Sequence, residues 1–195
     1  MGLSTAARNQ LLDTLTGLYA SLHTAYSTTG ANEVTGGTPA YARKSATFAA
    51  AASGARASSN TPVFDVPATT VRFIGLWSAV TAGTFLGMTA NGGTEVEFAV
   101  DLTAETVKVV AHGWAADQKI VFANGTAPGG LTAGTVYFVR NPTTDTFQVG
   151  ATAGGAAINL TAEASSDCVV SAIVEETFAA QGTLTVSSSS INLNS

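Results

Sequence analysis

The stretch Val107–Leu160, VKVVAHGWAADQKIVFANGTAPGGLTAGTVYFVRNPTTDTFQVGATAGGAAINL, decides how the chain is organised. Short runs rich in Val, Ile, Phe and Tyr alternate in it with clusters of Gly, Pro, Asn and Asp. This pattern predicts a small antiparallel β unit whose strands are joined by tight turns. The sequence on either side of it is typical of two pieces of another domain, so the β unit is expected to be an insertion.

Strand-like runs also fill most of the flanking sequence. In and around the β unit, strands are predicted at Thr94–Asp101, Thr106–Ala111, Lys119–Phe122, Thr135–Arg140, Thr146–Gly150, Ala157–Leu160 and Val169–Glu175. In the flanks, they are predicted at Leu18–Ala25, Ala40–Ala50, Arg56–Asp65, Thr70–Ser78, Thr84–Met88, Thr183–Val186 and Ile191–Leu193. In Leu18–Ala25 the apolar residues alternate with polar ones, which predicts a half-buried strand.

One helix is expected, from Ser4 to Thr16. Ser4 or Thr5 can cap its N-terminus, and Gly17 can end it. One apolar stripe is formed at helical spacing by Ala7, Leu11, Leu12 and Leu15. The predicted fold class is therefore all-β: a β-sandwich-like main domain with one short N-terminal helix and an inserted small antiparallel β domain. Its expected boundaries are residues 1–94 and 174–195 for the main domain and 95–173 for the insert.

Composition narrows the functional classes. Only 11% of the 195 residues are charged, well below the roughly 25% of an average globular protein, and this favours a surface that packs against copies of itself or a larger assembly. The formal net charge is −5 and the largest basic cluster is Arg43–Lys44, so nucleic-acid binding is not expected. The longest small apolar run, Phe48–Ala52, is too short to span a membrane, and the N-terminus lacks the apolar core of a signal peptide. The protein is expected to be made in the cytoplasm of the cell that produces it.

The flanking sequences resemble a family of bacteriophage virion proteins usually labelled tail fibre or minor tail proteins. The resemblance lies in SLHTAYSTTGANEVTGGTPAYARKSATFAAAASG, TPVFDVPATTVRFIGLWSAVTAGTFLG and EETFAAQGTLTVSSSSINLN. In that family the segment matching ETFAAQGTLTV follows soon after the one matching GTFLG, whereas residues 95–173 separate them here. The inserted part is similar to a β module scattered through phage tail and capsid-surface proteins, with HG, GTVYFV and FQVG in that order.

Candidate catalytic residues are few. The chain has two histidines, His23 and His112, and one cysteine, Cys168, so no intrachain disulfide can form. Serines are abundant but no G-x-S-x-G elbow is present. Cys168 lies in a Val-rich run and is more typical of a small buried hydrophobe than of a nucleophile. No catalytic set and no cofactor are expected from these residues.

Carboxylates form the only candidate metal site, and a weak one. Glu95 and Glu97 are two residues apart on a predicted strand and so share a face; together with Asp101 they can ligate Ca²⁺ or act as a glycosidase pair. Glu175 and Glu176, where the chain re-enters the main domain, are expected near the same domain junction. A cation or a basic partner is expected there to offset the repulsion between the clustered carboxylates. The simpler interpretation is a solvated strand face, and no metal is assigned.

Contacts with other molecules are expected at two turns of the insert, around Trp114 and around Pro128–Leu131. Trp77, in the apolar run Phe73–Leu76, is expected in the core, whereas Trp114 lies in a turn and is the better exposed aromatic. Pro128 and Leu131 are the second set of contact candidates. An aromatic shelf for sugars, with Tyr137 and Phe138, is an alternative use of these rings.

The sequence therefore predicts a non-enzymatic virion structural protein on the particle surface, a tail fibre or minor tail protein. A capsid decoration protein that stabilises the head is the first alternative, and a tail-borne glycan-active enzyme is the second. The resemblance implies a symmetric assembly, usually a homotrimer. Expected partners are copies of itself and other virion proteins, with a glycan or protein of the host surface as a further candidate; neither nucleic acid nor membrane insertion is expected.

Overall fold

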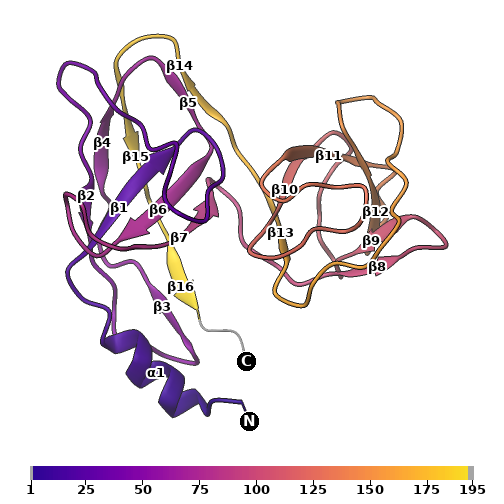
Figure 1. Cartoon of the computed structure of the whole chain (residues 1–195), viewed down its shortest axis with the longest axis horizontal. Helices are drawn as coiled ribbons and strands as arrows, with labels where there is room; N and C mark the ends of the chain where they lie inside the picture. The colour runs from indigo at the N-terminus through magenta and orange to yellow at the C-terminus, as the bar shows by residue number, and fades with distance from the viewer. Residues whose placement is uncertain (1, 193–195) are drawn as a thin grey trace.

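The computed structural model describes residues 2–192 and is all-β apart from one short helix, as predicted (Figure 1). The elements fall into two groups that lie side by side in Figure 1. The terminal group consists of α1 (Thr5–Asp13), β1 (Leu18–His23), β2 (Lys44–Ala46), β3 (Ala55–Ala57), β4 (Val63–Val66), β5 (Thr69–Val71), β6 (Phe73–Trp77), β7 (Phe85–Ala90), β14 (Glu176–Phe178), β15 (Gly182–Thr185) and β16 (Ser190–Asn192). The central group consists of β8 (Ala99–Asp101), β9 (Thr106–Lys108), β10 (Lys119–Ala123), β11 (Val136–Arg140), β12 (Thr146–Gly150) and β13 (Val169–Ala172).

The terminal group has a sandwich-like arrangement. One layer is a four-stranded antiparallel sheet in the order β2-β1-β6-β7. The other consists of three antiparallel pairs, in which β14, β15 and β16 return along β5, β4 and β3. The buried core draws on both layers: Ala20, Leu22, Val34, Ala46, Phe64, Val66, Val71 and Val186. The C-terminal strands thus complete a layer begun more than a hundred residues earlier in the chain.

Strand β1 is buried on both faces, so the prediction of a half-buried strand was wrong. Ser21 and His23, expected on the exposed face, are both 0% exposed. The loop between β1 and β2 folds back over them, and Ala31 within that loop accepts a hydrogen bond from the His23 ring. A covered polar face looks like a solvated one in sequence, because both carry polar residues.

The helix is shorter than predicted and its apolar stripe is mostly not buried. Ser4 is the N-cap, and its side chain accepts a hydrogen bond from the backbone N–H of Ala7. Leu12 is 0% exposed but Leu11 is 50% exposed, because α1 contacts little besides β3. Arg56 closes the C-terminal end by donating to the carbonyl groups of Leu12 and Leu15, which satisfies acceptors that the helix leaves free.

Two long strands predicted in the flanks are each divided in the structure. Pro62, which has no N–H to donate, separates β3 from β4. Arg72 separates β5 from β6, because the partner strand changes there from β14 to β1. Strand β2 occupies only three residues of the predicted Ala40–Ala50. Of the predicted Ile191–Leu193, the first two residues belong to β16 and Leu193 lies outside the described residues.

The central group is a six-stranded antiparallel sheet in the order β13-β10-β11-β12-β9-β8. Of the predicted Thr94–Asp101, only the last three residues form a strand, β8; upstream of it Val96 forms a bridge to Val170 of β13. This segment therefore contacts both edges of the sheet. Ala157–Leu160 is not a strand, contrary to the prediction, because only a single bridge joins Ala157 to Gly150. The enclosed core is Val107, Val109, Ile120, Phe122, Ala127, Tyr137, Val139, Phe147, Val149, Leu160, Cys168 and Val170.

The two groups are joined by a packed interface and by two adjacent connections. Val174 donates its N–H to the carbonyl of Asn91 at 2.8 Å, and the Asn91 side-chain amide donates to the carbonyl of Val174 at 3.0 Å. A third apolar cluster spans the two groups: Phe73, Met88 and Ala90 of the terminal group with Val121 and Ile173 of the central one. The chain thus leaves the terminal group and returns to it at nearly the same point.

Candidate functional site

A buried polar network lies beneath the loop that follows β1. The indole N–H of Trp77 donates to Ser21 Oγ at 3.0 Å, and Ser21 Oγ lies 2.7 Å from His23 Nε2. His23 Nδ1 lies 2.9 Å from the carbonyl oxygen of Ala31. A carbonyl only accepts, so Nδ1 carries the proton and Nε2 accepts from the Ser21 hydroxyl. Burial lowers the pKa of His23, which keeps the ring neutral in this chain of donors and acceptors.

The network fixes the loop and offers no access to a substrate. Ser21 and His23 are both 0% exposed, so a Ser–His pair is present without an open face. Gly75 is required beside it, because a Cβ there would lie 2.5 Å from both His23 Nε2 and Ser21 Oγ. The four polar atoms involved are all hydrogen-bonded, which is typical of a structural buried network.

An ion pair covers the network from the loop side. Arg43 Nη2 lies 2.7 Å from Glu33 Oε2, and Arg43 Nε lies 2.9 Å from Glu33 Oε1. The guanidinium group also stacks 3.5 Å above the Trp77 ring. Tyr41 donates its hydroxyl to Glu33 and accepts from the backbone N–H of Leu22, and burial raises its pKa. These contacts join both ends of the loop to the sheet.

The carboxylates considered as metal ligands have separate environments. Glu95 accepts a hydrogen bond from the Asn124 side chain, and burial raises its pKa. Asp101 accepts two backbone N–H groups of the turn that follows it, at 2.9 Å each. Glu97 is exposed. Within residues 2–192, no group of three or more His, Cys, Asp and Glu side chains is arranged to hold a metal ion.

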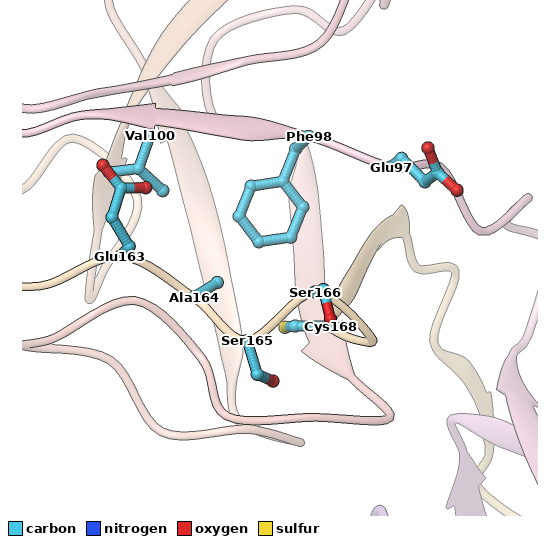
Figure 2. Close-up of a pocket in the computed structure, with 8 residues that line it drawn as sticks. All are labelled: Glu97, Phe98, Val100, Glu163, Ala164, Ser165, Ser166 and Cys168. Carbon is cyan, nitrogen blue, oxygen red and sulfur yellow. The ribbon is translucent and has the colours of Figure 1, made fainter.

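A small cavity of 150 Å³ lies beside Phe98 and Cys168 (Figure 2). In Figure 2 the Phe98 ring faces the chain segment Glu163–Ser166, whereas the carboxylate of Glu97 points away from the other labelled side chains. Burial raises the pKa of Cys168 to about 11, so its sulfur is a thiol near neutral pH and a poor nucleophile. The Cys168 sulfur lies 3.9 Å from the carbonyl oxygen of Val169.

Glu175 is the one acidic residue of the predicted junction group that meets basic side chains. Its carboxylate forms ion pairs with Arg72 of the terminal group, at 2.5 Å, and with Lys119 of β10. Hydrogen bonds from Lys119 and Arg72 lower the pKa of this carboxyl. A cation or a basic partner was expected here, and the chain itself supplies both cations from segments that are distant in sequence.

The residues expected at contact turns are less exposed than their positions suggested. Pro128 is buried, and Leu131 is partly buried against the central core. Trp114 is also partly buried, with its ring 5.4 Å from that of Phe147. The residue that sequence reasoning missed is Val110, which is 72% exposed. It lies in a turn two residues after the end of β9, and no pattern in the sequence distinguishes it.

Trp114 and Val110 line a groove of 350 Å³, here named the seam groove. It lies between segment 92–96, which enters the central group, and segment 109–114, which leaves β9. Its lining residues are Gly92, Gly93, Thr94, Val96, Val109, Val110, Ala111, His112, Trp114 and Ala172. Of the three contact residues predicted from the sequence, Trp114 lines this groove, whereas Pro128 and Leu131 do not.

The fold is that of an all-β protein with one short helix, whose strands fall into a terminal and a central group. Residues 2–98 match the model of the family described as Podophage GP4 fiber I protein gp80. The match covers the first part of the terminal group and ends just before β8. It supports a phage virion, tail-fibre type of protein. The comparison with curated proteins gave no match, and neither did the comparison with solved structures.

Within residues 2–192, no helix is long and apolar enough to cross a membrane.

Proposed function

We propose that the protein is a non-enzymatic structural component of a phage tail, carried as a tail fibre or minor tail protein on the particle surface. The observation that carries this proposal is the family match over residues 2–98, whose family is described as a fibre protein. The sites described above agree with it, because their polar groups are engaged in holding loops and joining strand groups. Such engagement is what a structural protein requires.

The proposed division of labour follows the two groups of strands. Residues 1–94 and 174–195 form the part that attaches to the particle, and residues 95–173 form an insert that projects from it. Three features support this division: the family match ends at residue 98, the C-terminal strands pair with β3, β4 and β5, and Asn91 bonds directly to Val174. An insert whose ends are adjacent leaves its host domain intact.

The insert is proposed to be held in a fixed direction and not to swing on a tether. Its Asn124 donates a backbone N–H to the hydroxyl of Tyr26 at 2.9 Å. Phe73 and Ile173, on opposite sides of the junction, are 1% and 2% exposed. A tethered domain would leave such apolar residues in water. A fixed insert presents the same surface outward on every copy in the particle.

Self-association is proposed for the terminal group, with a homotrimer as the state implied by fibre proteins. The exposed large apolar residues there include Leu3 at 53%, Leu11 at 50% and Val63 at 50%. With only 11% charged residues in the chain, little repulsion opposes contact between copies. The purified protein is expected to sediment as an oligomer at micromolar concentration, and a strict monomer at high micromolar concentration would contradict this part.

Capsid decoration remains the second candidate, because the longest described helix has nine residues and no long fibrous element is present among residues 2–192. Antibodies raised against the protein, bound to gold and viewed on intact particles by electron microscopy, separate the two. Label at the tail supports the proposal. Label over the head favours decoration, and particles without label reject both.

A further inference from the structure

The seam groove is lined by a segment, Val110–His112, that has three unusual features. Val110, 72% exposed, is the most exposed large apolar residue among residues 2–192. Its neighbour Ala111 has a positive φ of 51°, which an alanine rarely adopts. His112 follows, and its buried Nε2 has no hydrogen-bond partner among the described residues. All three lie in one short segment.

Each of these features is unfavourable for folding by itself. A non-glycine residue held at positive φ is strained, because its Cβ crowds the backbone. The backbone N–H of Trp114 donates to His112 Nδ1, so in the neutral ring Nε2 holds the proton and lacks an acceptor. Departures from good local structure collect at binding sites in natural proteins. The segment Val110–Trp114 is therefore the best candidate for a surface kept for a ligand.

The lining of the groove indicates what kind of ligand fits. Its lining contains no Asp, Glu, Lys or Arg, and the His112 imidazole is its only basic side chain. The Trp114 ring and Val110 supply an aromatic and an aliphatic surface, and the Thr94 hydroxyl supplies a polar group. Its 350 Å³ is at the small end of the range for ligand pockets, about 300–1,000 Å³.

We propose that the seam groove binds a neutral sugar residue of a surface glycan. A hexose presents a face of C–H groups, which packs against an aromatic ring, and an edge of hydroxyl groups, which needs hydrogen-bond partners. Trp114 and Val110 meet the first need, and Thr94 and nearby backbone groups meet the second. An anionic sugar or a phosphate finds no Lys or Arg in the lining to offset its charge. This inference rests on the proposed function only in taking the insert to face outward.

The test uses the two tryptophans of the full chain as reporters. In a ¹⁵N-labelled sample, the indole N–H signals of Trp77, buried in the terminal group, and Trp114, in the groove, are titrated with millimolar neutral oligosaccharides built from glucose, galactose, rhamnose or N-acetylglucosamine. The Trp114 signal is expected to move with at least one of them while the Trp77 signal stays. No movement with any of these sugars overturns the proposal, as does an equal response of both signals.

A matched pair of variants tests whether the sugar binds in the seam groove. Val110→Glu places a charge at the groove in a side chain that is 72% exposed, and Val80→Glu does the same at a 45% exposed site in the β6–β7 turn. Val110→Glu is expected to weaken sugar binding at least about tenfold, with Val80→Glu unchanged. Equal binding by Val110→Glu and the parent overturns the proposal. The structural role is judged separately, by whether each variant is still incorporated into particles.

Discussion

Removal of residues 94–173 should leave the terminal group folded, because the chain needs only a short turn to replace them. The deletion joins Gly93 to Val174 and creates the sequence Asn91-Gly92-Gly93-Val174. The hydrogen bond from Val174 N–H to the Asn91 carbonyl, 2.8 Å in the full chain, then becomes the closing bond of a four-residue β-turn. Gly92 already has a positive φ of 71°, which a two-residue hairpin turn requires.

The cost of this deletion follows from the apolar cluster at the junction. Phe73 and Met88 are 1% and 9% exposed in the full chain and lose the cover of Val121 and Ile173. Full burial of a Phe or Met side chain is worth about 1.5–3 kcal/mol, so exposing both costs at most about 3–6 kcal/mol. That is comparable with the total stability of a small domain, about 5–15 kcal/mol. The shortened chain should therefore fold with reduced stability.

Fluorescence measures this outcome directly, because the deletion removes Trp114 and leaves Trp77 as the only tryptophan. Trp77 is 9% exposed, so a folded terminal group gives blue-shifted emission and a cooperative urea transition at lower urea than the full chain. A second version with Met88→Thr reduces the newly exposed apolar surface and guards against aggregation. Red-shifted emission without a transition in both versions would refute the reasoning about the insert.

The remaining predictions concern single side chains. Gly75→Ala should destabilise the fold by about 1–3 kcal/mol, because the new Cβ would lie 2.5 Å from His23 Nε2. In thermal unfolding, Gly2→Ala is the control, since the space around Gly2 is open. Equal melting temperatures of the two variants would refute the buried network. The stability that the Glu175 ion pairs contribute is present above the usual pKa of 4.5 and is lost as pH falls through the lowered pKa of the folded state. In urea unfolding from pH 7 to pH 3, the free energy of unfolding of Glu175→Gln should therefore fall less with acid than that of the parent. The same dependence on pH in both proteins would contradict the ion pairs. Cys168, 4% exposed with its pKa raised to about 11, should resist iodoacetamide at neutral pH until the protein unfolds, whereas rapid labelling of the native protein would contradict its burial.

The strands of the central group were largely predictable, because each apolar run is bounded by turn residues. Lys119–Phe122 and Thr146–Gly150 were predicted within one residue of β10 and β12. Strand β10 is an apolar run buried from Ile120 to Ala123, and β12 is buried at Phe147, Val149 and Gly150, so local pattern and tertiary environment agree. The strand predicted at Ala157–Leu160 is not formed, because this segment makes only one bridge, from Ala157 to Gly150.

The terminal group was harder to predict, since its pairing is remote in sequence. Strand β14 pairs Glu176–Phe178 with residues that precede it by more than a hundred positions, and a short run with one aromatic residue gives no local sign of a strand. Ser21 and His23 were placed on the wrong face for a related reason. Their cover comes from Ala31 and Trp77, and polar residues satisfied by one another are not distinguishable in sequence from polar residues in water.

The candidate sites were predictable in kind but not in position. Trp77 is buried, as expected from its apolar run, whereas Trp114, expected to be exposed in its turn, is partly buried against the central core. Pro128 was taken as a contact residue on the same turn argument, yet it is buried because its loop folds onto the central core. The pairing of Glu175 with Arg72 and Lys119 depends on three distant segments, and no spacing rule reveals it.

Counting copies of the protein in purified phage particles tests the proposed function most directly. Quantitative mass spectrometry with labelled reference peptides gives the ratio of this chain to the major capsid protein. A tail fibre or minor tail protein should be present in a few to a few dozen copies per particle. Hundreds of copies would contradict the tail assignment in favour of decoration, and absence from particles would contradict the structural role altogether.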